Sequence, residues 1–168
     1  MRNTSRLLCL ALLCTLSGAL AFARIGNAHY VAGRDPITDA NTSTIGLPER
    51  YDTAYATVLS IGCLSSRPSV SLSVKSQIVG DAGVLPRIVY RSGSGPARNA
   101  RVTAGLPGDP RQSGNTVTLS PADSQALLSG GMNSTRVAVE TLTQGARATY
   151  VFPTRGLAQA WKASGRCG

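Results

Sequence analysis

Residues 148–168, ATYVFPTRGLAQAWKASGRCG, decide how this chain folds. Apolar and polar side chains alternate over residues 148–152, which predicts a half-buried β-strand. A short helix is expected next, with Thr154 as its N-cap and Gly165 as its stop. Its apolar side chains recur at helical spacing, so they would form one stripe that packs on a sheet. This stripe consists of Leu157, Ala160 and Trp161.

Residues 1–23 predict a secretory signal peptide. A positively charged start precedes an almost continuous apolar run at 7–16, and the motifs ALA at 19–21 and AFA at 21–23 are both small-x-small cleavage sites. A membrane anchor is the alternative, but the apolar run is shorter than the roughly 20 residues that a span needs. We therefore expect a secreted or periplasmic protein that has no stable membrane span after cleavage.

The cysteines predict one disulfide in the mature protein. Signal cleavage removes Cys9 and Cys14 and leaves Cys63 and Cys167, and an even pair in an oxidising compartment indicates a disulfide. This bond would close a loop of about a hundred residues and stabilise the fold by up to about 4–5 kcal/mol in the chain-entropy model. Lipid attachment to a signal cysteine is an alternative, but a leucine precedes each one where a small residue is needed. With neither a CxxC motif nor a Cys/His cluster, no metal or cofactor is expected.

Residues 24–53 are expected to form a flexible N-terminal arm. Gly, Asn, Asp and Thr are frequent there, two X-Pro pairs interrupt any regular element, and the apolar residues show no period. The packed domain is therefore expected at 54–168. Short alternating segments and two helix signals predict a mainly β fold, a small antiparallel sheet or sandwich with its C-terminal helix tied by the disulfide.

Alternation and turn residues position the other elements of this domain. A first helix is expected after Ser120, the candidate N-cap, because Pro121 and Asp123 fit its first turn. The expected strands are 54–64, 68–79, 86–91, 97–104, 115–119, 136–142 and 147–152.

The mature chain is basic. Fifteen of the 17 Lys and Arg residues follow the signal, against all eight Asp and Glu, so its charge is near +7. A hairpin in the middle of the chain would gather Arg and Tyr, which are favoured at interfaces, onto one surface. The alternatives are an ordinary solvated surface, or arginines that only prevent sheet-to-sheet pairing at an edge. The expected binding patch consists of Arg87, Tyr90, Arg91, Arg98 and Arg101.

The sequence predicts a protein that is not an enzyme. Of the eight acids, four lie in the expected arm and two in turns, while Asp123 is a capping residue and Glu140 would face solvent on a strand. His29, the one histidine, has no nearby Asp, Ser or Cys partner. The glycine-rich segment 92–96 lacks the strand-to-helix context of a phosphate-binding or nucleophile loop.

Several features occur in a fixed order along the chain: Cys63, the Tyr-Arg strand and glycine loop at 89–93, ATYVF at 148–152, GLAQA at 156–160 and Cys-Gly at 167–168. This order resembles that of small periplasmic proteins associated with type VI secretion, of the VasI/TagO kind, over about two-thirds of the chain. The chain departs from them in lacking a mid-domain Trp and in carrying a long arm. The resemblance implies a non-enzymatic envelope protein that binds other proteins.

We therefore expect an exported envelope protein that binds a protein partner or another envelope component, and the resemblance adds an association with a secretion system. One alternative is an inhibitor of an envelope hydrolase, a lysozyme or a protease, which would present a rigid loop at 92–96 or 106–114. The other is a basic polyanion-binding protein. This last alternative is weakened because only Tyr90 lies among the arginines, whereas single-strand binders interleave aromatic residues.

Overall fold

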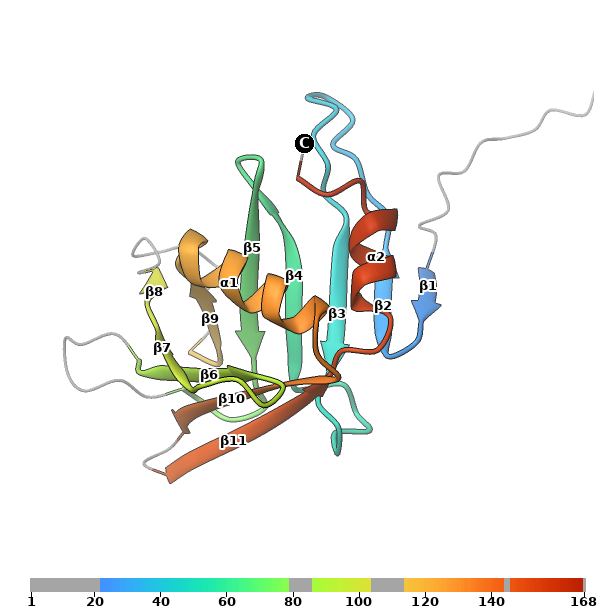
Figure 1. The fold of residues 1–168 in the computed structure, drawn as a ribbon. Coiled ribbons are helices and arrows are strands. Elements are labelled where there is room, and N and C mark those ends of the chain that lie inside the picture. Colours follow the sequence, from blue (N-terminus) through green and yellow to red (C-terminus); the bar gives the residue numbers. More distant parts are fainter. Residues whose placement is uncertain (1–21, 79–85, 104–113, 144–145, 168) are drawn as a thin grey trace, which may run out of the picture.

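A computed structural model describes residues 22–78, 86–103, 114–143 and 146–167. In these ranges the chain forms two antiparallel sheets and two helices, which confirms the predicted mainly β fold (Figure 1). In spatial order, the seven-stranded sheet consists of β1 (Phe22–Ile25), β2 (Ala28–Val31), β3 (Thr44–Pro48), β4 (Val58–Leu64), β5 (Arg67–Ser73), β9 (Thr116–Leu119) and β8 (Val102–Thr103). The four-stranded sheet consists of β11 (Ala146–Pro153), β10 (Arg136–Thr143), β6 (Ile88–Ser92) and β7 (Arg98–Ala100). The helices are α1 (Pro121–Met132) and α2 (Leu157–Ala163).

Alternating side chains give each sheet one buried side. In β4 and β5, Leu59, Ile61 and Leu72 are almost fully buried, while the residues between them are partly exposed. In β10, Val137 and Val139 are buried and their neighbours are less so. A period of two is typical of antiparallel sheets that pack one face on the core.

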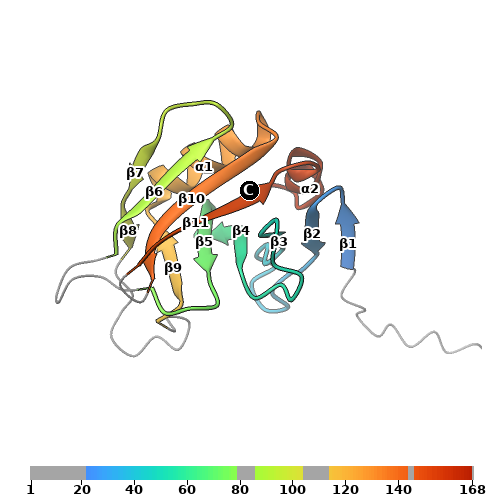
Figure 2. The ribbon, with the colours of Figure 1, turned by 90° about the horizontal axis from the view of Figure 1, so that it is seen from below.

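Both helices lie on the same side of the seven-stranded sheet (Figures 1 and 2). Helix α1 contacts β5 of this sheet and also β6 and β10 of the four-stranded sheet, whereas α2 contacts β1, β2 and β3. The N-cap of α2 is Gly156 and not the expected Thr154, whose hydroxyl donates to the Ser134 carbonyl instead. The predicted apolar stripe is confirmed, since its three members are buried: Leu157, Ala160 and Trp161.

The start of α1 holds the corner where the two sheets meet. The strand expected at 97–104 is divided, because β7 belongs to the four-stranded sheet and β8 to the seven-stranded sheet. Between them, the Arg101 N–H donates to Asp123 Oδ2 (2.9 Å), and the Arg101 carbonyl accepts from the Ser120 N–H (2.7 Å). Ser120 is the N-cap of α1, as predicted, and its hydroxyl accepts from the Asp123 N–H (3.3 Å).

The prediction of a flexible arm at 24–53 is wrong. This stretch supplies β2, β3 and the last two residues of β1, and these three strands form one side of the seven-stranded sheet. Ala28 and Ile45 are completely buried, and β3 pairs with β4. β1 and β2 have only four residues each, too few for a clear period, and Pro48 is tolerated because it ends β3. The packed domain therefore begins before residue 54.

Most of the predicted signal peptide, residues 1–21, lies outside the described residues. Its last two residues, Phe22 and Ala23, belong to β1 and pair with β2. Cleavage after Ala21 would leave β1 whole, whereas cleavage after Ala23 would remove its first two residues. Among the residues that the structure describes, no helix is both long and apolar enough to cross a membrane.

The predicted disulfide between Cys63 and Cys167 is present, with an S–S distance of 2.05 Å and the two Cα atoms 5.5 Å apart. Cys63 lies near the end of β4, and Cys167 follows α2. Gly165 ends the preceding helix with a φ of +76°, a conformation that glycine adopts without strain. The bond therefore ties the closing helix to the middle of the larger sheet, as expected.

Candidate functional site

The β6–β7 hairpin and its flanks carry the five predicted patch residues, but the fold does not bring them onto one surface. Tyr90 lies opposite Arg98 in the antiparallel register, so both belong to the same side of the sheet. Tyr90 is only 3% exposed, so this is the side that faces the core and α1. Arg91 follows Tyr90 in the strand and therefore lies on the outer side.

Tyr90 and Arg101 contribute to the fold. Burial of the Tyr90 ring raises the pKa of its phenol, and the Asp123 carboxylate adds to this effect, while Arg98 opposes it. The buried hydroxyl therefore stays neutral on the inner side of the sheet. Arg101 uses its backbone N–H and carbonyl at the corner described above, although its side chain is exposed. Tyr90 therefore does not share a surface with Arg91.

A different set of arginines gathers on the outer side of the four-stranded sheet, the side viewed from below in Figure 2. Arg91 lies opposite Ala138 in the register, on the same side as Arg136 two residues before it in β10. Arg87 Nε donates to Asn99 Oδ1 (3.3 Å) on this side. We call the set the basic sheet face: the exposed Arg87, Arg91, Arg136 and Arg147, with Glu140.

The basic sheet face carries excess positive charge. Glu140 is its one acid in the described part of the chain, and the only ion pair it forms there is with Arg147, at 3.9 Å. Both partners are exposed, so the pair contributes little to stability. A shallow depression of about 390 Å³ lies between Arg91, Arg136 and Glu140 and has Val89 and Val151 in its lining. The face thus combines cationic groups with partly exposed apolar surface.

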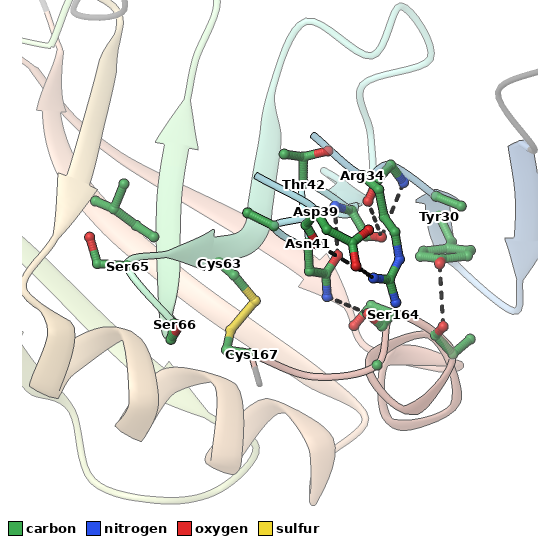
Figure 3. A pocket seen from close by; sticks show the side chains of 17 residues that line it. Tyr30, Arg34, Asp39, Asn41, Thr42, Cys63, Ser65, Ser66, Ser164 and Cys167 are labelled. Atoms are coloured by element: carbon green, nitrogen blue, oxygen red, sulfur yellow. Dashed lines mark hydrogen bonds and ion pairs between the residues drawn. A yellow bond between two sulfur atoms is a disulfide. The ribbon is translucent and has the colours of Figure 1, made fainter. Parts of the chain in front are cut away.

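A cavity of about 820 Å³ lies at the other end of the molecule, beside the disulfide (Figure 3). The Tyr30 hydroxyl donates to the Ala163 carbonyl (3.3 Å). The Asn41 amide donates to the carbonyls of Ser164 and Arg166, the latter at 2.8 Å. These bonds connect the β2–β3 connection to the C-terminal segment, so the polar side chains here stabilise the fold.

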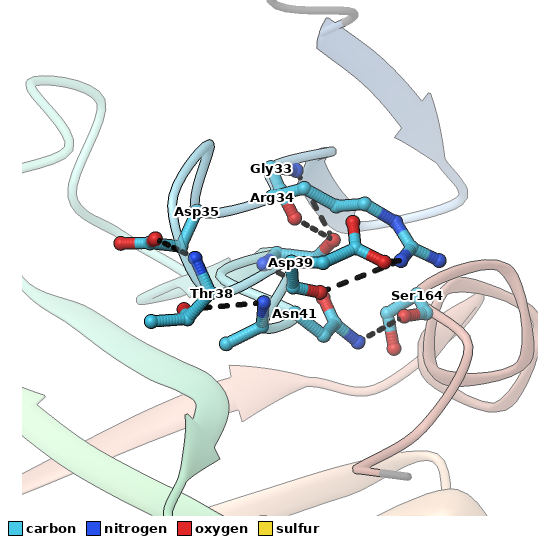
Figure 4. A network of polar contacts seen from close by, with 9 residues as sticks. Gly33, Arg34, Asp35, Thr38, Asp39, Asn41 and Ser164 are labelled. Carbon is cyan, nitrogen blue, oxygen red and sulfur yellow. Dashed lines mark hydrogen bonds and ion pairs between the residues drawn. The ribbon is translucent and has the colours of Figure 1, made fainter.

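Residues 34–41, at the tip of the β2–β3 connection, form a compact turn beside this cavity (Figure 4). The Asp35 N–H donates to the Ala40 carbonyl (2.8 Å), and the Asp39 N–H donates to the Asp35 carbonyl (2.9 Å). Donation from the N–H groups of Thr38 and Ile37 lowers the pKa of the Asp35 carboxyl. The expected arm therefore contains a well-defined turn that sequence reasoning missed. The Asp-Pro pair was its only local signal.

The geometry of His29 indicates packing. Its ring lies edge-on to that of Tyr55, with 5.2 Å between the ring centroids. His29 Nε2 is buried and has no hydrogen-bond partner among the described residues. No group of three or more His, Cys, Asp or Glu side chains that could hold a metal occurs in the described ranges.

Comparisons with family models, curated proteins and solved structures found no match to this chain. The resemblance to type VI secretion-associated proteins stays a prediction. A function is therefore inferred from the positions and charges of the described residues.

Proposed function

We propose that this protein is an exported binding protein without catalytic activity, and that its basic sheet face contacts an acidic surface of a protein partner. The observation that carries the proposal is the gathering of four exposed arginines around one glutamate on a single sheet face. Arginine binds carboxylates bidentately and is enriched at protein interfaces. Val89 and Val151 lie among the charges, so a partner would also cover apolar surface.

Two separate observations support export. The chain starts with a predicted signal peptide, and Cys63 and Cys167 form a disulfide, which persists in oxidising compartments. A secreted or periplasmic location is compatible with this bond. Association with a secretion system is proposed on the resemblance alone.

The proposal is tested by charge reversal on the basic sheet face. Mature protein with Arg91→Glu and Arg136→Glu is used to capture partners from an envelope extract, beside the unmodified protein. Because an exposed ionic contact is screened by salt, capture by the unmodified protein should fall about tenfold between roughly 0.05 and 0.5 M salt. The double variant should lose capture even at low salt.

The matched control reverses two exposed arginines that lie elsewhere, Arg67 at the start of β5 and Arg155 after β11. Arg67→Glu with Arg155→Glu changes the net charge equally and should leave capture unchanged. Equal capture by both double variants, or capture that is insensitive to salt, would show that the basic sheet face is not the contact surface.

A basic polyanion binder is the second candidate, favoured by the excess of arginine. Single-strand nucleic acid binders also use exposed aromatic rings. The tyrosines of β6 and β11, Tyr90 and Tyr150, lie opposite Arg98 and Val139 on the inner side of the sheet. Binding to heparin or a mixed-sequence oligonucleotide that is lost in Arg91→Glu/Arg136→Glu, without any captured protein, would favour this candidate.

A further inference from the structure

A second surface lies at the end of the molecule away from the basic sheet face. The β2–β3 connection projects beyond the strands at the upper end in Figure 1, while β6, β10 and β11 lie at the lower end. At its tip, the Ile37 side chain is 92% exposed, the most exposed of the large hydrophobic side chains in the described ranges. An aliphatic side chain in this position gains nothing from burial in the folded chain.

Hydrogen bonds within the turn fix its conformation (Figure 4). Asp35 Oδ1 accepts from the N–H groups of Ile37 (2.9 Å) and Thr38 (2.8 Å). The Asp39 N–H donates to the Asp35 carbonyl (2.9 Å), and the Asp39 carboxylate pairs with Arg34 Nη1 (2.9 Å). The polar groups of the turn are thus used within it, which leaves the Ile37 side chain as its outward apolar group.

The turn is also fixed relative to the rest of the molecule. At its base, Asn41 Nδ2 donates to the carbonyls of Ser164 and Arg166, and Arg166 immediately precedes the disulfide residue Cys167. Across the base, the Thr42 N–H donates to the Gly33 carbonyl (3.0 Å). The position of the turn is therefore coupled to the cross-linked C-terminal segment.

Single exposed apolar residues are common on protein surfaces and mean little by themselves. Ile37 differs because it is presented by a turn that is already ordered, and an ordered loop loses little conformational entropy on binding. We propose that the 34–41 turn inserts Ile37 into an apolar pocket of a folded protein partner. This goes beyond the proposed function, since it uses another surface and another kind of contact.

The shape of the turn restricts the kind of partner. Protease clefts and sheet edges bind extended segments, whereas the hydrogen bond from Asp39 to Asp35 closes this segment into a turn. Ile37 is therefore not a substrate mimic. The partner has a pocket sized for one branched aliphatic side chain.

The first test locates the contact. A photo-cross-linking amino acid replaces Pro36, an exposed neighbour that leaves Ile37 intact, in the full chain expressed in its own host. One discrete protein adduct is expected. The same probe at Tyr51, an exposed side chain of the β3–β4 connection, should not form it. Ile37→Asp in the chain that carries the Pro36 probe should abolish the adduct. The absence of an adduct at position 36, or its survival in Ile37→Asp, would overturn the proposal.

The second test measures the affinity of the purified adduct protein by calorimetry. Removing one methylene in Ile37→Val should weaken binding about fourfold, and Ile37→Ala should weaken it about 10- to 100-fold. Asp35→Ala keeps Ile37 but removes the hydrogen bonds that order the turn. It should weaken binding, because a less ordered turn makes the entropy of binding less favourable. Tyr51→Ala and Arg91→Glu should leave it unchanged, which separates this proposal from that of the basic sheet face. Equal affinity of Ile37→Ala and the unmodified protein would contradict the insertion.

Discussion

Asp35 illustrates how one carboxylate holds a turn at the scale of a residue. The N–H groups of Thr38 and Ile37 donate to it, which lowers its pKa, while its charged neighbours Arg34 and Asp39 pair with each other. Because the pKa of Asp35 is lower in the folded than in the unfolded chain, its ionised carboxylate stabilises the turn. This stabilisation is complete above the pKa of the unfolded chain, near 3.9, and is lost as the pH falls through the pKa of the folded chain. We therefore expect the turn to loosen only in acid, below about pH 4.

This expectation is checked by NMR, following the amide signals of Ile37 and Thr38 from pH 6 to pH 2 (a range chosen to span the roughly 3.9 of a free aspartate). Both should titrate together with a midpoint below that of a free aspartate. Asp35→Asn should remove the titration and leave amides of β4 unchanged. A midpoint at or above the value of a free aspartate would contradict the hydrogen-bonded turn.

Helix α1 depends on close approach to β6 at the scale of an element. Gly130 lies inside this helix, where replacing glycine by alanine ordinarily stabilises by about 1 kcal/mol. Here a Cβ at position 130 would lie 2.7 Å from Ser92 Cβ and 2.6 Å from Ser92 Oγ. The clash with Ser92 should outweigh the gain in helix propensity, because Ser92 lies in a strand and cannot easily move away. Gly130→Ala is therefore expected to lower the free energy of unfolding by about 1–3 kcal/mol.

Urea denaturation measures this effect, and the neighbouring glycine gives the control. A Cβ at Gly131 would meet methyl groups of Leu157 and Val137 at 3.1 and 3.3 Å, which can adjust, so Gly131→Ala should cost less. Adding Ser92→Gly to Gly130→Ala should restore part of the loss. Equal stability of Gly130→Ala and the unmodified protein would mean that α1 can move away from β6.

The disulfide acts at the scale of the whole molecule, since it joins residues 104 positions apart. Replacing both Cys63 and Cys167 by alanine is expected to reduce the free energy of unfolding by about 2–5 kcal/mol. Without the bond, the hydrogen bonds from the Asn41 amide to the carbonyls of Ser164 and Arg166 should also weaken. In hydrogen exchange, amides of 164–166 and 34–41 should therefore exchange faster than those of β4. Unchanged unfolding and exchange would show that packing of α2 suffices without the bond.

Local sequence patterns predicted most of the structure of residues 148–167 correctly. The alternation at 148–152, the apolar stripe of α2 and the Ser120 cap each arise within one short segment, where residue spacing determines which side chains share a face. The Cys63–Cys167 pairing followed from the small number of cysteines left after the signal. Where the expected Thr154 cap was wrong, a more distant acceptor, the Ser134 carbonyl, had engaged its hydroxyl.

What the sequence by itself determined is therefore the mainly β class, the two helices and the cross-link, because these depend on local spacing and on counting. Only the tertiary structure decided that β2 and β3 join the sheet, since β3 is stabilised by pairing with β4 and β2 by pairing with β3. It also decided which side of β6 is covered, so that Tyr90 is buried, and it placed Arg136 beside Arg91. Strand register, and which face of a sheet a helix packs on, depend on contacts between segments far apart in the chain, so a local sequence pattern cannot predict them.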